Sequence, residues 1–233
     1  MNVVITGATK GIGLAISKLF AAQAANVAIC SRTMDDIVSV AKTLSEDYPN
    51  IEILGHAADM SVKEDVKEFA AIISENWEQV DVLINNAGVF IPGPMTEPSA
   101  ETEDAFELMM NTNLYSAYYM TQALLPLMLP HQSGHIFNMC SIASIMPYGA
   151  YAVSKHAMLG FSRVLREELK TKGIRVTAVM PGATYTASWE GTDIPEERFM
   201  KATDIAEAVW GCYQLSPQTV VEELILRPQL GDI

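Results

Sequence analysis

The chain has 233 residues, of which 49% are hydrophobic and 18% charged, and its formal net charge at pH 7 is −13. This length and apolar content allow one large core, whereas an acidic chain without a dense Lys/Arg cluster is a poor partner for nucleic acid or an anionic membrane. Because no apolar run reaches membrane-spanning length and a strand is predicted from residue 2, leaving no room for a signal peptide, we expect a cytoplasmic protein with neither partner.

The cysteines and histidines give no sign of a disulfide framework or a metal site. Three cysteines lie far apart, which is typical of reduced, mostly buried thiols in a cytoplasmic protein. The four histidines have no metal-ligand spacing such as HExxH. The sequence therefore predicts that no metal is bound.

The first predicted element is a short apolar strand, residues 2–6, which leads directly into a turn rich in glycine. The turn is Thr6-Gly7-Ala8-Thr9-Lys10-Gly11-Ile12-Gly13, and a helix is predicted over residues 12–24. Glycines let a backbone approach phosphates closely, and a helix N-terminus offers free N–H groups and a positive dipole end. Glycines also mark ordinary turns, but the flanking strand and helix favour a pyrophosphate-binding turn.

The second predicted strand, residues 26–31, bears on the choice between NAD and NADP. It ends at Ser31, and Arg32 follows, where an NAD-binding protein usually has an acidic residue for the ribose 2′-hydroxyl. Arg32 can instead pair with a 2′-phosphate, and Lys10 adds a second cation. Both cations could also be ordinary solvated side chains. The missing carboxylate makes NADP the expected cofactor and NAD the less favoured one.

Strands and helices continue to alternate along the chain. We predict further strands over residues 51–55, 81–84, 134–139, 174–180 and 222–227, and further helices over residues 34–48, 61–77, 100–129, 149–171 and 203–215. Several strands are continuous apolar runs, as expected for parallel strands covered on both faces. The alternation, without repeat or linker, predicts a single α/β domain over residues 1–233, with a doubly wound, seven-stranded parallel sheet and helices on both faces.

Four polar residues on or next to these predicted elements are candidates for an active site. Tyr151 and Lys155 lie four residues apart on one face of a predicted helix, although such a pair is commonly just helix surface. Ser141 follows the strand at 134–139 and could be a strand-end cap. Asn113 lies within the helix at 100–129 and could be an interior polar residue. Their joint order behind a phosphate-binding turn points to an active site.

At these residues the chain resembles the short-chain dehydrogenase/reductase family, over almost its whole length. The shared motifs occur in the family's order and are the turn at residues 6–13, Asp59-Met60, Asn85-Asn86-Ala87-Gly88, Asn113-Leu114, Cys140-Ser141-Ile142-Ala143, Tyr151-xxx-Lys155 and Pro181-Gly182. The resemblance implies a Rossmann fold, with a cofactor-binding part near residues 1–130 and a catalytic and substrate part near 131–233. It also implies an NADP-dependent oxidoreductase acting on a small carbonyl or alcohol.

The resemblance implies that Asn113, Ser141, Tyr151 and Lys155 form a catalytic tetrad. Tyr151 would give a proton to a carbonyl oxygen or take one from an alcohol, and the Lys155 ammonium would favour the phenolate and bind the nicotinamide ribose. Ser141 would hold the substrate oxygen, and Asn113 would hold a water in a proton path through Lys155 and the ribose. The hydride chemistry belongs to the nicotinamide.

The resemblance also implies cofactor contacts beyond the first turn. Asp59 would accept a hydrogen bond from the adenine amino group, and Thr186 would contact the nicotinamide carboxamide. The 85–88 turn would support the sheet and lie against the cofactor. Outside the first turn and the tetrad, the expected cofactor-binding residues are Ser31, Arg32, Asp59, Met60, Asn86, Ala87, Gly88, Pro181, Gly182, Thr184 and Thr186.

One interval departs from the family pattern. Ser141 precedes Tyr151 by ten residues, about three fewer than usual, and the deletion falls within residues 145–150. Asn138 sits at the longer interval, but the flanking Ser-Ile-Ala pattern favours Ser141. We expect the chemistry to survive and the loop that lines the substrate pocket to differ.

The substrate end of the site is the least specified part of the sequence. Residues 183–192 correspond to a mobile substrate lid in the family, in which Trp189 is either a pocket wall, the interpretation we favour, or an exposed loop aromatic. Met95, Met146 and Tyr148 are further pocket candidates. No anchor for a substrate carboxylate is evident.

The resemblance also bears on assembly, and two other functions compete with the oxidoreductase. The apolar helices at 100–129 and 149–171 pair across a two-fold axis in the family, which implies a homodimer or homotetramer. A catalytically silent NADP-sensing protein on the same fold would typically lose the tyrosine or the lysine. An epimerase of the related extended family would have a different glycine spacing and a longer C-terminal part.

Overall fold

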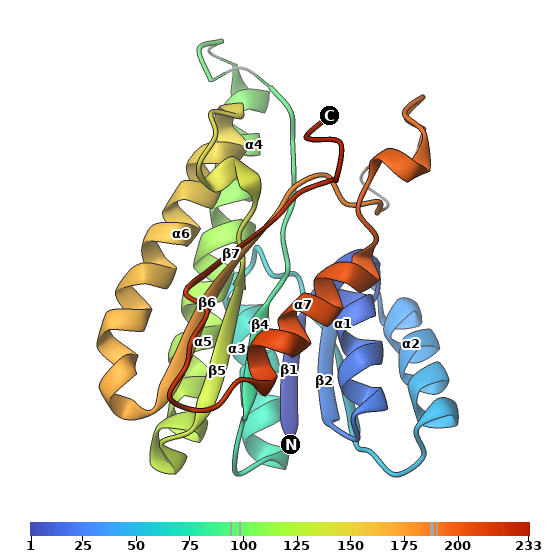
Figure 1. Ribbon diagram of the computed structural model, residues 1–233, viewed down its shortest axis with the longest axis vertical. Coiled ribbons are helices and arrows are strands. Elements are labelled where there is room, and N and C mark those ends of the chain that lie inside the picture. The colour runs from blue at the N-terminus through green and yellow to red at the C-terminus, as the bar shows by residue number, and fades with distance from the viewer. Residues whose placement is uncertain (94, 98, 187–188, 190) are drawn as a thin grey trace.

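The computed structural model describes residues 1–93, 95–97, 99–186, 189 and 191–233. Its seven strands form one parallel sheet in the order β3-β2-β1-β4-β5-β6-β7 (Figure 1). The strands are β1 (Asn2–Thr6), β2 (Asn26–Ser31), β3 (Ile53–Ala57), β4 (Val82–Asn85), β5 (Gly134–Met139), β6 (Ile174–Pro181) and β7 (Glu223–Leu226). The doubly wound α/β prediction is confirmed.

Helices cover both faces of this sheet. They are α1 (Gly11–Ala22), α2 (Met34–Asp47), α3 (Lys63–Asn76), α4 (Ala100–Met110), α5 (Ser116–Met128), α6 (Gly149–Leu169) and α7 (Ala202–Gln214). Successive side chains of a strand point to opposite faces, so Val3 and Ile5 of β1 pack with α1, α2 and α7, whereas Val4 packs with α3, α5 and α6. None of the helices described is long and apolar enough to cross a bilayer.

Two predicted boundaries are wrong. The third strand begins at Ile53, opposite Val27, because Ile51 belongs to the turn after α2, where its N–H donates to the Tyr48 carbonyl. The helix predicted over 100–129 is divided by a π-helical turn at Asn111–Tyr115. A periodicity of apolar residues predicts a helix but not one extra residue within a turn of it.

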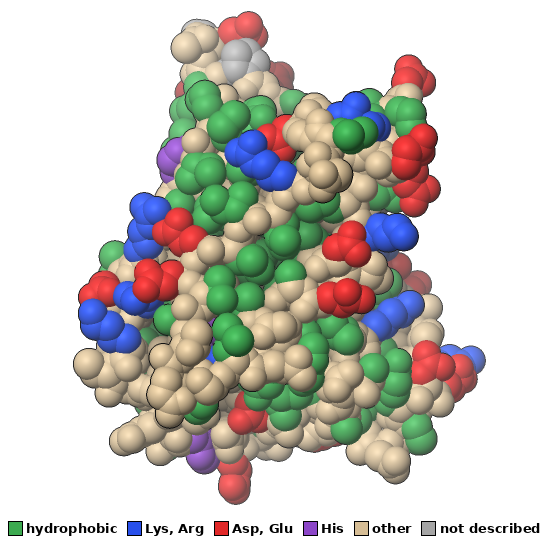
Figure 2. All heavy atoms as spheres, in the orientation of Figure 1, with side chains coloured by type: hydrophobic (Ala, Val, Ile, Leu, Met, Phe, Trp, Pro, Cys, Tyr) green, Lys and Arg blue, Asp and Glu red, His purple; other side chains and the backbone are tan. Residues whose placement is uncertain are grey.

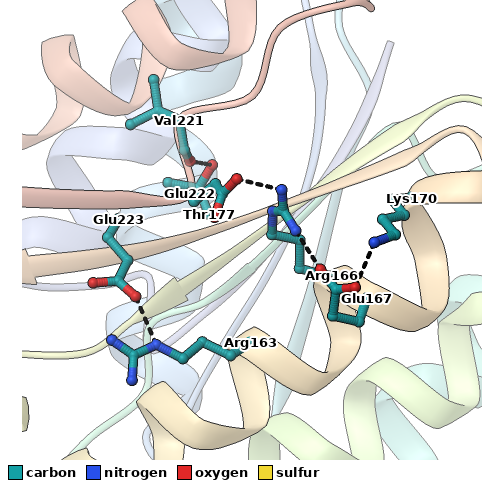
Figure 3. Close-up of polar contacts among 8 residues, drawn as sticks. All are labelled: Arg163, Arg166, Glu167, Lys170, Thr177, Val221, Glu222 and Glu223. Atoms are coloured by element: carbon teal, nitrogen blue, oxygen red, sulfur yellow. Dashed lines mark hydrogen bonds and ion pairs between the residues drawn. The ribbon is translucent and has the colours of Figure 1, made fainter.

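Ion pairs tie α6 to the edge strand β7 (Figure 3). Arg163 Nε lies 2.7 Å from Glu223 Oε1, and Arg166 pairs with Glu222. Exposed pairs of this kind each contribute at most about 1 kcal/mol. Their geometric effect is to hold β7, and with it the start of residues 227–233, at a fixed place beside α6.

Apolar side chains remain exposed on two parts of the surface. Figure 2 shows hydrophobic side chains gathered over the middle of one face, where β7 and α7 lie, and Ile225 of β7 is 50% exposed. Tyr118 of α5 and Val164 of α6 are exposed as well. The expected dimer or tetramer stays a prediction.

A buried histidine on β5 should make stability depend on pH. The His135 ring is fully buried, with Nε2 2.7 Å from Thr177 Oγ1. Burial, assisted by the charge of Arg175, lowers the pKa of His135 to about 2. An unfolded histidine has a pKa near 6.5, so below that pH the unfolded state alone takes up the proton. The free energy of unfolding is therefore highest above pH ~6.5. Below that pH it falls by about 1.4 kcal/mol for each pH unit.

His135→Gln should remove this dependence. Urea unfolding at pH ~7.5 and ~5.5 should show that the parent loses about 1.4 kcal/mol more than the variant between these two values. His131→Gln, at an exposed position, is the matched control and should behave as the parent does. Equal losses in the parent and His135→Gln would contradict a neutral buried imidazole.

Candidate active site

The turn between β1 and α1 accepts only glycine at its key positions. Gly7 and Gly11 have φ values of +64° and +53°, in the left-handed region. A Cβ on Gly13 would lie 2.2 Å from the Gly7 carbonyl oxygen. The α1 N-cap, Lys10, makes no side-chain capping bond, so the N–H groups of this helix end remain available to an anion.

The turn after β4 is hydrogen-bonded to this first turn. Asn86 Nδ2 donates to the Thr6 and Gly7 carbonyls, each at 2.9 Å, and the N–H groups of Asn86 and Ala87 both donate to Thr6 Oγ1 at 3.0 Å. β1 and β4 are the neighbours at which the strand order reverses. Ligands of doubly wound sheets bind in the crevice at this point.

Two cations, Arg32 and Lys10, stand at the expected adenosine end, and one of them is paired with an aspartate. Arg32 is exposed directly after β2 and forms no ion pair within the part of the chain that the structure describes. Lys10 Nζ lies 3.1 Å from Asp36 Oδ2, with the lysine side chain 68% exposed. Of the two cations, Arg32 is therefore the one without a carboxylate partner among the described residues. Ser31 Oγ accepts from the Thr33 N–H at 3.3 Å.

The residues after β3 lie at the same end of the sheet. Asp59 Oδ1 accepts from the N–H and hydroxyl of Ser61 at 2.9 and 2.7 Å, and the Asp59 N–H donates to Asp65. Met60 is buried, with its sulfur 3.6 Å from Cys30 Sγ. The Asp59 carboxylate is thus held in place by its own loop.

A cavity of about 390 Å³ lies at the carboxyl ends of β5 and β6. It brings together many of the residues predicted from the sequence. Those that line it are Ile12, Ser141, Tyr148, Tyr151, Pro181, Gly182, Thr184, Thr186 and Trp189. Two predicted catalytic hydroxyls therefore share one cavity with a residue of the first turn and the Pro-Gly segment.

Tyr151 and Lys155 sit side by side at the start of α6. Lys155 Nζ lies 5.8 Å from the centre of the Tyr151 ring and donates to the Met139 carbonyl at 2.7 Å. The lysine is only 4% exposed. A Cβ on Gly88 would lie 3.5 Å from Lys155 Nζ, an ordinary contact, so the 85–88 turn lies next to the ammonium.

Asn113 lies in the π-helical turn and is 1% exposed. Its Nδ2 donates to the Val89 carbonyl and to Ser154 Oγ, each at 2.9 Å, while Oδ1 accepts from the Val89 N–H at 2.7 Å. The Asn113 side chain thus joins the loop after β4, through Val89, to α6, through Ser154. The expected water at Asn113 stays a prediction.

Ser141 and Asn138 occupy different surroundings. Ser141 lines the cavity, and its Oγ accepts from the Ala143 N–H at 3.1 Å, which leaves the hydroxyl proton free to point elsewhere. Asn138 is fully buried between the side chains of Asn85 and Ser162, at 2.8 Å from each. The geometry therefore favours Ser141 as the group that meets a substrate.

The shortened loop before Tyr151 turns sharply at Gly149, whose φ is +59° and whose Cβ would lie 2.9 Å from the Gly93 carbonyl. It presents Tyr148 to the cavity, whereas Met95 and Met146 are absent from the described residues that line it. Glycine at 149 lets the chain enter α6 over the shorter interval.

The expected substrate lid is described only in part. Trp189 lines the cavity and packs against Phe199, with ring centres 4.9 Å apart. Its predicted place as a pocket wall fits this position. Ala187, Ser188 and Glu190 of the expected lid lie outside the described residues.

Sequence reasoning missed two notable cavity residues, Phe90 and Asp232. Phe90 meets Tyr151 edge-on, with ring centres 5.0 Å apart, and could have been inferred from its position two residues after Gly88. Asp232 lies far along the chain, in a segment without secondary structure, and no local motif marks it.

Comparisons with known proteins agree with this geometry. The family model described as short chain dehydrogenase matches residues 1–196. A sepiapterin reductase of Chlorobaculum tepidum is 36% identical, over 98% of this chain and 96% of that protein.

Solved structures agree as well. An alcohol dehydrogenase from the archaeon Thermococcus sibiricus, complexed with 5-hydroxy-NADP, has a TM-score of 0.87 and 31% identity, over 98% of this chain and 96% of that chain. The L-sorbose reductase of Gluconobacter frateurii, complexed with NADPH and L-sorbose, has a TM-score of 0.87 and 25% identity, over 97% and 94%.

Proposed function

Since the chain belongs to the short-chain dehydrogenase family of oxidoreductases, we propose that it transfers a hydride between NADP and a small carbonyl or alcohol substrate. One observation carries the proposal. The Ser141 and Tyr151 hydroxyls line the same cavity as Ile12 of the first turn and the Pro181-Gly182 segment. A substrate oxygen and a cofactor ring can therefore meet there.

The residues around the first turn fit a dinucleotide. The positive φ values of Gly7 and Gly11, and the 2.2 Å approach that a Cβ on Gly13 would make, leave bare backbone where a pyrophosphate would lie. Bound NADP would supply the hydride. Asp59 would face the adenine, and the 85–88 turn and Thr186 would lie along the cofactor.

The chain's own residues would manage the proton. Tyr151 would donate its phenolic proton to the carbonyl oxygen during reduction, while Ser141 holds that oxygen through a hydrogen bond. The Lys155 ammonium, close to the Tyr151 ring, would favour the phenolate that results and would bind the nicotinamide ribose. Alcohol oxidation would use the same groups in reverse.

A panel of ketones and aldehydes, assayed with NADPH and NADH by absorbance, tests both the activity and the cofactor. We expect NADPH to be the better substrate, because Arg32 can pair with a 2′-phosphate and the end of β2 has Ser31 where an acidic residue would hold a 2′-hydroxyl. Arg32→Ala should weaken NADPH binding about 10- to 100-fold, the loss expected for a charged hydrogen bond, and leave NADH nearly unchanged.

Lys172→Ala, an equal charge change at an exposed site far along the chain, is the control. Equal affinity for NADPH and NADH in the parent would reject the roles of Arg32 and Lys10. No turnover across the panel, with either cofactor and in either direction, would reject the activity.

We also propose that residues 1–233 work as one domain and that α5 and α6 contact their copies in a dimer or tetramer. The support is that one sheet contains strands from both the cofactor-binding and the catalytic parts. Exposed apolar side chains on these two helices, such as Tyr118 and Val164, offer the surface for the contact.

A further inference from the structure

Residues 227–233 return to the active-site cavity after β7. The Gly182 N–H donates to the Leu226 carbonyl at 2.8 Å, and the Gly231 N–H donates to the Pro228 carbonyl at 2.9 Å. These bonds turn the segment back over the carboxyl end of β6, the end of the sheet at which Figure 1 places the C-terminus. Asp232 lines the cavity as a result.

The two carboxylate oxygens of Asp232 have different surroundings. Oδ2 lies 2.9 Å from Arg227 Nη1. Oδ1 is buried and accepts no hydrogen bond from the part of the chain that the structure describes. It lies 3.0 Å from the place that a Cβ on Gly182 would take, so it packs against Gly182, which lines the cavity with Asp232. A buried acceptor without a donor is unfavourable, so an N–H group of a ligand that reached Oδ1 would be favoured there.

The other described residues lining the cavity include no Lys, Arg or His. Phe90, Tyr148 and Trp189 supply aromatic walls instead. A substrate carboxylate would therefore meet Asp232 and find no cation among these side chains. A substrate N–H group would meet an oriented acceptor sheltered from competing water.

We propose that Asp232 selects the substrate: its Oδ1 accepts a hydrogen bond from an N–H group, so the enzyme prefers carbonyl compounds that carry an ammonium or amide and disfavours those that carry a carboxylate. This rests on the proposed oxidoreductase function. Arg227 positions the carboxylate by holding Oδ2. The terminal torsion of an aspartate is soft, so a small turn of the carboxylate can bring Oδ1 to a donor while Oδ2 stays beside Arg227.

Three ketones of one shape test the proposal: para-(aminomethyl)acetophenone, para-methylacetophenone and para-acetylbenzoate, each reduced with NADPH. In the parent we expect kcat/KM to be at least about tenfold higher for the ammonium ketone than for the carboxylate ketone. Asp232→Asn should bring that ratio to within about threefold of one, with the KM for NADPH unchanged. Asp47→Asn makes the same chemical change at the exposed end of α2 and should keep the parental ratio.

A parental ratio near one, with the neutral ketone still reduced, would overturn the role of Asp232 and leave the proposed function standing. A loss of NADPH affinity in Asp232→Asn, with the ratio kept, would also overturn it. If none of the ketones is reduced, the binding of benzylamine and benzoate to the protein with NADPH decides. Isothermal titration calorimetry measures the two dissociation constants, and equal values would reject the proposal.

Discussion

Tyr151→Phe should lower turnover about 10²- to 10⁴-fold, the range expected when a general acid/base is lost. The change keeps the ring, and with it the edge-on contact to Phe90, but removes the only proton that the ring can give. NADPH affinity, measured by fluorescence titration, should stay close to the parental value. A fall in kcat without a change in cofactor binding would separate a chemical role from a binding role.

Tyr148→Phe is the informative comparison, because Tyr148 brings a second phenol to the same cavity. It is 43% exposed and stands before the positive-φ turn at Gly149 instead of beside Lys155. We expect this variant to keep most of its turnover. If Tyr148→Phe were inactive and Tyr151→Phe active, the acid/base would have been assigned to the wrong residue.

Lys155→Met should reduce both turnover and NADPH affinity, with kcat falling by about 10²-fold or more if the ammonium favours the phenolate. The side chain is 4% exposed, and its hydrogen bond to the Met139 carbonyl, at 2.7 Å, pairs it with a neutral acceptor. Burying a charge without a counter-charge is costly, so methionine should fill the space at least as well. The melting temperature should therefore be equal to or above the parental value.

Lower activity together with an unchanged or higher melting temperature would show that Lys155 serves catalysis and not the stability of the fold. Lys172→Met, at an exposed position, should alter neither quantity. A large loss of stability in Lys155→Met, with the remaining folded protein fully active, would contradict the assigned role.

Much of the site could be predicted because its residues are local to strand ends and turns. The glycines of the first turn are dictated by backbone geometry, and the close approach at Gly13 shows why no other residue would serve there. Tyr151 and Lys155 are placed by helix spacing alone. Ser141 follows β5 directly, so the strand delivers it to the cavity whatever the length of the next loop.

The unpredicted features depend on contacts between distant segments. Asp232 reaches the cavity because the Gly182 N–H donates to the Leu226 carbonyl. No local sequence pattern predicts this contact. The buried state of Asn138 depends on Asn85 and Ser162, residues on two other elements. The side-chain engagement of Asn113 with Val89 likewise joins elements that are separate in the sequence.

The π-helical turn at Asn111–Tyr115 has a consequence for the position of Asn113. Its hydrogen bonds join residues five apart instead of four, so the turn takes in one residue more than an α-helical turn would. Deleting one residue from this turn should therefore leave a continuous α-helix from α4 to α5 and move the Asn113 side chain away from Val89 and Ser154. Exchanging an exposed residue such as Tyr115 should leave those bonds in place.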